Sequence, residues 1–228
     1  YYLELLFLCH YYTILACSWD LLSGFTGNIN FGHAFFIGGA GYVGAVLNLN
    51  LGWSPWLTLP AGGITAAGCG LLVGTVTLRL KGPYFAAVTF CFGTLLYKWF
   101  MVSSKFLGGE EGLSGVLPLT DSPLGNYYFS AIFMCAVILL LYFVSKSSFG
   151  MILRSIGENE TASEGSGINT TYYKVVAFAI SAAIAGVAGT MYGHTQMHVG
   201  PEMAHDSLSA LVLMMAVVGG MGSIIGPI

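Results

Sequence analysis

The chain has 228 residues, of which 56% are hydrophobic and 7% are charged, and its formal net charge is −3 at pH 7. Soluble domains carry about 25% charged residues, so this composition excludes an ordinary soluble domain and indicates a membrane protein. The small net charge and the lack of a basic run give no reason to expect a nucleic-acid partner. The five cysteines lie in apolar stretches without a CxxC pair, so we expect buried thiols rather than disulfides or a metal site.

Seven apolar stretches are long enough to span a membrane, because a helix needs about 20 residues to cross the hydrocarbon core. In chain order, the predicted spans cover 4–22, 33–49, 56–78, 83–102, 128–145, 174–193 and 207–225. The second is rich in glycine, and Gly219 and Gly220 interrupt the last, which allows either to be broken or re-entrant. We therefore predict an all-α, polytopic transmembrane bundle that forms one domain over residues 1–228. Both ends lie in apolar stretches, and we expect the protein to continue beyond them.

Two polar residues lie in or beside the first two predicted spans. Asp20 is a carboxylate near the end of the first span, and ionisable residues inside a membrane are functional candidates by default. His33 opens the second span. Both are candidates for a polar path across the membrane. Hydration of Asp20 at the membrane surface and a hydrogen-bonded role for His33 at a helix end remain open as alternatives.

The distribution of Lys and Arg predicts which side of the membrane each loop faces, because cytoplasmic loops retain positive charge. Five of the seven basic residues fall on one side, namely Arg79, Lys81, Lys146, Arg154 and Lys174. We assign this side to the cytoplasm. The loops at 50–55, 103–127 and 194–206 then face outward, and they carry the acidic residues Glu110, Glu111 and Glu202.

Residues 147–170 form a polar, helix-compatible segment between two long apolar stretches, and we place this segment in the cytoplasm. We predict two helices with a break in this segment. Ser147 or Ser148 can cap the first helix, Gly165 and Gly167 end it, and Asn169 or Thr170 caps the next span. Phe149, Ile152, Leu153 and Ile156 recur at helical spacing and give the first helix an apolar face. Two interpretations remain open at this point: an amphipathic linker on the membrane surface, or a short helix docked in a groove of a cytosolic partner.

Two further patterns suggest binding sites that their context does not support. Residues 39–44 match GxGxxG, but a dinucleotide site needs a preceding strand and an acidic residue about 20 positions later, so we attribute these glycines to helix packing. His194, His198, Glu202 and Asp206 recur every four residues, but Gly200-Pro201 should break the helix that would bring them together. The sequence also lacks the Walker A motif of ATP-binding proteins. We expect this chain to bind no metal or cofactor.

Several segments along most of the chain carry a family resemblance when taken in order. They are LLSGFTG (21–27), FGHAFF (31–36), GY (41–42), LKGPYFAAVTF (80–90), GEEGL (109–113), and the segments 149–160, 167–169, 173–174, 200–203 and 219–222. In this order they resemble the permease subunits of branched-chain amino-acid type ABC importers, a family that also includes urea and short-amide permeases. The chain departs from the family where Asp20 replaces a common amide, where Gly157 replaces a frequent basic residue, and at Ser166.

The resemblance implies a multi-pass permease of the bacterial inner membrane. Its implied partners are a second permease subunit, two cytosolic ATP-binding subunits and an external solute-binding protein, with ATP and Mg²⁺ bound by the ATP-binding subunits. It assigns residues 147–170 to coupling with an ATP-binding subunit, through Glu158, Asn159, Glu160 and Gly167. By their predicted side of the membrane, Glu110, Glu111 and Glu202 are candidates for docking the external protein.

Branched-chain amino acids are the first expectation for the solute, with urea or a short amide as the alternative. Two other classes of protein remain in view. An ion-coupled secondary transporter would need paired ionisable residues inside the membrane, and Asp20 alone gives little support for that. An intramembrane hydrolase would need a Ser/His pair or a set of metal ligands at membrane depth, and the histidines lie mostly in predicted loops.

Overall fold

The computed structural model describes residues 2–78, 80, 82–120, 122–224 and 226. Within this part of the chain, six helices are long and apolar enough to cross a membrane: α1 (Tyr2–Thr26), α2 (His33–Leu51), α3 (Pro55–Thr77), α4 (Pro83–Val102), α6 (Pro123–Lys146) and α9 (Thr170–Gln196). The shorter helices are α5 (Ser104–Leu107), α7 (Ser148–Glu158), α8 (Glu160–Gly165) and α10 (Asp206–Gly219). Two 3-10 turns, η1 (Gly109–Glu111) and η2 (Pro201–Ala204), and an antiparallel pair of short strands, β1 (Leu113–Ser114) and β2 (His198–Val199), complete the fold.

The first six predicted spans are confirmed as helices, with bounds that differ by a few residues. Prolines explain three of the starts: Pro55, Pro83 and Pro123 occupy the first helical position, where the missing N–H is not needed. The glycine-rich second span is continuous. The chain is therefore an all-α, multi-pass membrane protein, as the sequence predicts.

The seventh predicted span, 207–225, is corrected to a shorter helix. α10 has 14 residues and so reaches only about 21 Å at 1.5 Å per residue, less than a bilayer core. It ends at Gly219 because Gly220 adopts a φ of 112°, which residues with a Cβ rarely adopt. The predicted interruption at Gly219 and Gly220 is therefore present, and it ends the helix.

α9 forms the centre of the bundle and packs against α1, α2 and α3. Small residues allow the close approach: a Cβ on Gly186 would overlap the Cβ of Ala66 and lie 2.8 Å from the carbonyl oxygen of Gly62. A Cβ on Gly189 would overlap the carbonyl group of Ile37 on α2. Helices in lipid associate through such van der Waals contact, so these positions fix the arrangement of α2, α3 and α9.

The prediction of buried thiols is wrong for most of the cysteines. Cys17 is buried, whereas Cys9, Cys69, Cys91 and Cys135 are exposed at the bundle surface. An apolar run in a membrane protein can face lipid as well as the protein interior, so hydrophobic neighbours do not predict burial here.

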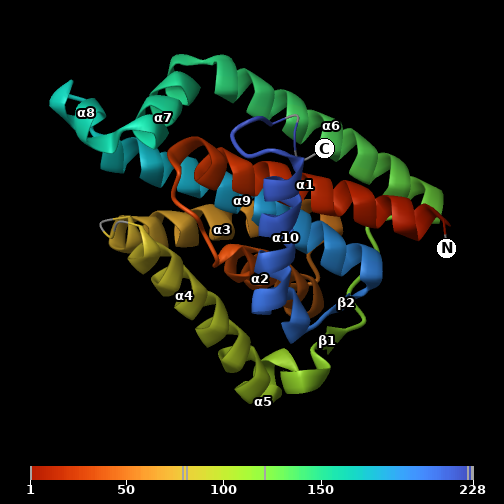
Figure 1. The fold of residues 1–228 in the computed structure, drawn as a ribbon. Coiled ribbons are helices and arrows are strands. Elements are labelled where there is room, and N and C mark those ends of the chain that lie inside the picture. Colours follow the sequence, from red (N-terminus) through yellow and green to blue (C-terminus); the bar gives the residue numbers. More distant parts are fainter. Residues whose placement is uncertain (1, 79, 81, 121, 225, 227–228) are drawn as a thin grey trace.

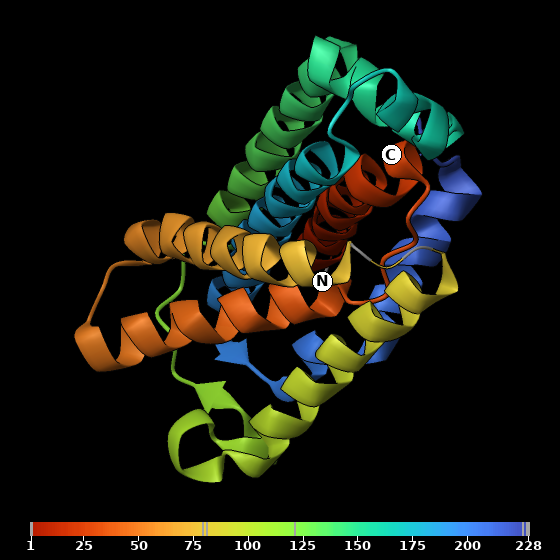
Figure 2. The ribbon, with the colours of Figure 1, turned by 90° about the vertical axis from the view of Figure 1, so that its left-hand side faces the viewer.

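The two ends of the bundle differ in structure (Figure 1, Figure 2). α7 and α8 lie at one end, which we call the inner end, and α5, β1 and β2 lie toward the opposite, outer end. The segments 103–127 and 147–170 are thus at opposite ends, as the charge distribution predicts. Arg79 and Lys81, which contributed to that prediction, lie outside the described residues.

Candidate coupling site at the inner end

α7 and α8 form a helical hairpin, which we call the inner hairpin (148–165), between α6 and α9. Ser147 caps α7, with its hydroxyl accepting a hydrogen bond from the Gly150 N–H, and Leu153 and Ile156 are buried on the predicted apolar face. The two helices with a break that the sequence predicts are present, but the break lies at Asn159 and not at Gly165. α7 ends at Glu158, where Asn159 takes an extended conformation and caps α8 by accepting a hydrogen bond from the Ala162 N–H (3.0 Å).

Gly167 ends α8 and turns the chain toward α9. Its φ of 84° is left-handed, and its N–H donates to the Glu164 carbonyl (2.9 Å) while the Ile168 N–H donates to the Ser163 carbonyl (3.1 Å). This is the Schellman arrangement that commonly ends helices at glycine. Asn169 then caps α9 by accepting a hydrogen bond from the Tyr172 N–H (3.1 Å), as predicted. The structure thus gives Gly167 a conformational role, and its contact with a partner remains a prediction.

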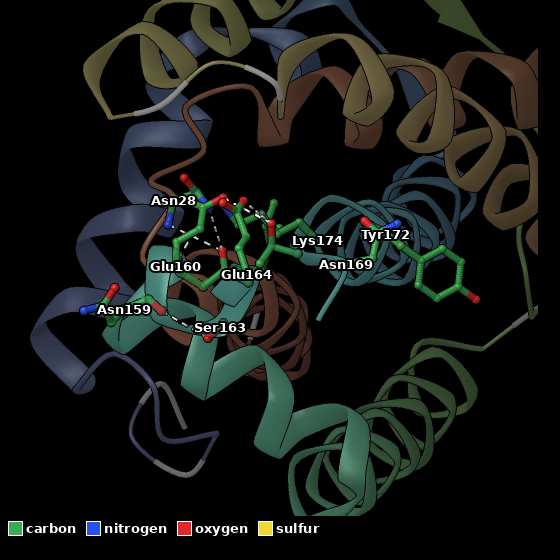
Figure 3. A network of polar contacts seen from close by, with 11 residues as sticks. Asn28, Asn159, Glu160, Ser163, Glu164, Asn169, Tyr172 and Lys174 are labelled. Carbon is green, nitrogen blue, oxygen red and sulfur yellow. Dashed lines mark hydrogen bonds and ion pairs between the residues drawn. The ribbon is translucent and has the colours of Figure 1, made fainter. Parts of the chain in front are cut away.

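A buried ion pair fastens the inner hairpin to α9 (Figure 3). Lys174 Nζ lies 2.7 Å from Glu160 Oε1, and the Lys174 side chain is only 3% exposed. Beside it, the Thr170 hydroxyl donates a hydrogen bond to Glu164 Oε1 (2.9 Å). Both carboxylates of α8 therefore point at the first turns of α9. In the sequence, Lys174 indicates only the side of the membrane, and nothing there marks it as the partner of Glu160.

Glu158, Asn159 and Gly167 are the exposed members of the predicted contact set, and Glu158 is the one that carries a charge. Within the described residues Glu158 makes no hydrogen bond or ion pair, whereas Glu160 is paired with Lys174. Glu158 lines a groove of about 360 Å³ together with Arg154, Gly157 and residues of α1. The inner hairpin therefore presents one free acidic group toward solvent and uses the other acidic groups to hold its own position.

The inner hairpin also packs directly on the end of α1. Gly157 has no side chain, and a Cβ at this position would overlap the carbonyl oxygen of Phe25. The Arg154 guanidinium carbon lies 4.8 Å from the centre of the Phe25 ring, a cation–π contact. The departure from the family pattern at Gly157 thus has a steric reason in this chain, because no larger residue fits there.

Asp20 and His33 are both fully buried. Asp20 Oδ1 accepts a hydrogen bond from the Gly222 N–H (2.8 Å), which holds the turn after α10 against α1. His33 Nε2 lies 3.0 Å from the Ser18 hydroxyl, so it ties the start of α2 to α1. These contacts give each residue a packing role, and their place in a translocation path stays a prediction.

The acidic residues proposed for external docking lie together at the outer end. Glu110 and Glu111 belong to η1 and Glu202 belongs to η2, and η1 contacts η2 beside the β1–β2 pair. All three are exposed. Two distant segments therefore bring exposed acidic residues to the same end of the bundle, while a docking role for these residues remains a prediction.

The four-residue repeat at 194–206 does not form one helical face, because α9 ends at Gln196 and Gly200-Pro201 start a new turn. His194 is buried. Its Nε2 lies 2.6 Å from the Thr58 hydroxyl, and its Nδ1 lies 2.7 Å from the Leu117 carbonyl oxygen. A neutral ring that donates from Nδ1–H and accepts the Thr58 proton satisfies both contacts. His194 thereby joins α9 to α3 and to the loop before α6. It is part of the packing and not of the external loop that the sequence suggested.

Replacing His194 by alanine should destabilise the protein by about 2 kcal/mol, because the Thr58 hydroxyl and the Leu117 carbonyl lose a buried partner. Thermal unfolding of the detergent-solubilised protein measures this change. His198→Ala is the matched control four residues later, since the His198 side chain is 39% exposed and lies 3.9 Å from Glu202; it should leave the midpoint almost unchanged. A chelator that lowers the wild-type midpoint as much as His194→Ala does would instead indicate a metal site.

Comparison with known proteins identifies the family. The model of the branched-chain amino acid transport system permease component family matches residues 1–228. The chain belongs to this family. Among curated relatives, the high-affinity branched-chain amino acid transport system permease protein LivM of Salmonella typhimurium is 32% identical over 93% of this chain and 57% of its own length, and LivM of Escherichia coli gives the same figures.

More distant permeases are also similar to this chain. The autoinducer 2 import system permease protein LsrC of Escherichia coli is 30% identical over 79% of this chain and 54% of its own length. The nucleoside ABC transporter permease protein NupC of Lactococcus lactis is 28% identical over 61% of this chain and 48% of its own length. The chain spans about half the length of the curated relatives it matches. No solved structure matches it significantly. The family resemblance read from the sequence motifs is confirmed.

Proposed function

We propose that this chain is a permease subunit of an ATP-binding-cassette importer in the bacterial inner membrane and that it moves branched-chain amino acids. Its partners are a second permease subunit, two cytosolic ATP-binding subunits that hold ATP and Mg²⁺, and an external solute-binding protein. The chain itself supplies a path and a mechanical link and needs no cofactor. The observation that carries this proposal is the inner hairpin, which exposes Glu158 to solvent and is fastened by Lys174 to the central helix α9.

The structure suggests how motion reaches the membrane spans. A partner that moves the inner hairpin also moves α9 through the Lys174–Glu160 pair, and moves α1 through the contact of Gly157 with Phe25. Because α9 packs closely on α2 and α3, all four helices respond. ATP drives this change only if the nucleotide-bound partner prefers one arrangement of the permease over the other.

Charge reversal at Glu158 tests the coupling. In the transporter assembled with its partner subunits, Glu158→Lys should lower solute-stimulated ATP turnover by about tenfold or more, because a charged contact between subunits is lost and reversed. Membrane insertion should be unchanged, since the Glu158 side chain is exposed and makes no hydrogen bond or ion pair within the described part of the chain. Glu160 is unsuitable for this test because its reversal would also break the pair with Lys174.

Lys146→Gln is the control for this experiment. Lys146 is charged and exposed at the same end of the bundle, where it lies over the Tyr142 ring (5.9 Å) at the end of α6, outside the inner hairpin. It should retain wild-type turnover. Normal solute-stimulated turnover in Glu158→Lys would refute the assignment of the inner hairpin as the coupling site.

The solute is tested by uptake into vesicles. Radiolabelled L-leucine, L-isoleucine and L-valine should accumulate when the external solute-binding protein and ATP are present. Relatives named for autoinducer 2 and for nucleosides define the competing solutes, which are measured in the same vesicles. Uptake that continues without the ATP-binding subunits and collapses with the proton gradient would instead identify an ion-coupled transporter.

A further inference from the structure

The connection between α9 and α10 enters the bundle instead of passing over its end. It begins at the outer end, where β2 pairs with β1. It then packs against the first half of α2, since a Cβ on Gly38 would lie 2.8 Å from the backbone nitrogen of Ala204. The first residue of α10, Asp206, accepts a hydrogen bond from the Thr94 hydroxyl (2.8 Å), and Thr94 lies near the middle of α4. α10 therefore begins at about the middle of the membrane spans.

α10 covers the remaining distance to the inner end. Ser209, one turn into α10, accepts a hydrogen bond from the Ala34 N–H at the start of α2 (2.8 Å). After α10, Gly222 reaches Asp20 near the inner end of α1. Figure 1 shows α10 running past α2 to α1. The segment from β2 to Gly222 thus runs from the outer toward the inner end, first as irregular chain with the 3-10 turn η2 and then as the α-helix α10.

The junction at the start of α10 exposes polar groups at this depth. His205 and Ser207 are exposed and Asp206 is partly exposed. The His205 Nδ1 accepts a hydrogen bond from the Ser207 N–H (3.2 Å), which leaves Nε2–H of the neutral ring as a donor. An Asp at the centre of a bilayer costs about 2.5–3.5 kcal/mol. Non-helical backbone at membrane depth is tolerated only where protein covers it or water fills the space beside it. Lipid is therefore excluded as the neighbour of this junction.

Two buried polar atoms, one at the junction and one nearer the outer end, lack hydrogen-bond partners within the described residues. One is Asp206 Oδ1, whose second oxygen is bound by Thr94. The other is the hydroxyl of Tyr42 on α2, a residue that is 2% exposed and close enough to Glu202 to interact electrostatically with its carboxylate. A buried polar group without a partner costs about 1–3 kcal/mol, so both atoms favour water or a polar solute beside them.

We propose that the junction of the non-helical segment with α10 lines the water-filled path that the solute crosses, with His205, Asp206 and Ser207 in contact with a small polar solute and with Thr94 orienting the Asp206 carboxylate. This inference rests on the proposed import function. It assigns the path to a part of the chain distinct from Asp20 and His33, which are fully buried between helices.

Accessibility of engineered thiols tests the proposal in the assembled transporter. Ser207→Cys and His205→Cys are made separately after replacement of the five native cysteines by alanine. Each variant is treated in proteoliposomes with a charged, membrane-impermeant methanethiosulfonate reagent. The control is Ile132→Cys, which is 69% exposed near the middle of the apolar helix α6. Thiolates form in water and not in lipid, so a path-lining cysteine should react about tenfold or more faster than the control.

L-leucine at saturating concentration provides the second measurement and should slow the reaction of Ser207→Cys. A thiol at position 207 as unreactive as that at 132 overturns the proposal. So does a reaction rate unaffected by leucine in a preparation that takes up leucine. If leucine is not taken up at all, the proposed solute fails, and the comparison of positions 207 and 132 still decides whether the junction lines a water-filled path.

Discussion

Replacing Lys174 by methionine should separate ATP turnover from transport while leaving the membrane bundle folded. The substitution keeps the length of the side chain but removes the cation that Glu160 faces at 2.7 Å. Breaking a buried pair by removing one partner costs about 3–5 kcal/mol. Glu160 is 24% exposed, so water offsets part of this and we expect about 2–3 kcal/mol. This loss of stability weakens the contact between α8 and α9 and leaves the packing of the membrane spans unchanged.

Hydrogen exchange and ATP turnover measure the two consequences of Lys174→Met. Amides of 160–167 should exchange faster, because α8 is no longer held to α9. Basal ATP turnover should persist, since Glu158 is still presented to the partner, whereas its stimulation by solute should be lost. The control is the double variant Lys174→Met with Glu160→Gln, which leaves no unpaired buried charge and should recover much of the stability. Equal stability of the single and double variants would show that the ion pair is not what fastens α8.

The sequence predicts those parts of this fold that lipid and local chemistry determine. Apolar runs must be helical in a bilayer, so the sequence predicts six of the spans to within a few residues of the observed helices. A short polar side chain before an apolar helix satisfies its first N–H groups, so the sequence narrows each cap to two neighbours, Ser147 or Ser148 and Asn169 or Thr170; the structure selects the first of each pair. The glycines after α10 were recognised as an interruption because they tolerate backbone angles that other residues avoid.

The parts that could not be predicted depend on three-dimensional placement. The pairing of Lys174 with Glu160 depends on the turn at Gly167, which brings α8 back to α9. In the sequence, the only sign of a buried ion pair is a single lysine at the start of an apolar run. The depth of α10 depends on how η2 packs against α2, which composition does not record. The position of the break at Asn159 is not predicted because glutamates, which favour helices, flank it directly, and only its side-chain cap shows that a second helix begins there.

Replacing Gly157 by valine should have the second large effect, because it separates the inner hairpin from α1. Every side chain places a Cβ where the Phe25 carbonyl oxygen lies, and valine adds two further methyl groups. Overpacking of this kind costs about 1–3 kcal/mol, and here the neighbour is backbone, which cannot rotate away. α7 must therefore shift, and the stacking of Arg154 on the Phe25 ring should be lost with it.

Gly165→Ala is the matched control for this change, since Gly165 lies in the same hairpin and a Cβ there meets nothing within 4 Å. It should be neutral or slightly stabilising, because alanine is the better helix former by about 1 kcal/mol. In Gly157→Val we expect a lower thermal midpoint and the loss of leucine-stimulated ATP turnover, with co-purification of the ATP-binding subunits as the measure of docking. Subunits that remain bound but unstimulated would show that α1 must follow the inner hairpin for the signal to pass. Stimulated turnover equal to that of Gly165→Ala would show that α1 takes no part, and that α9 alone carries the motion into the membrane.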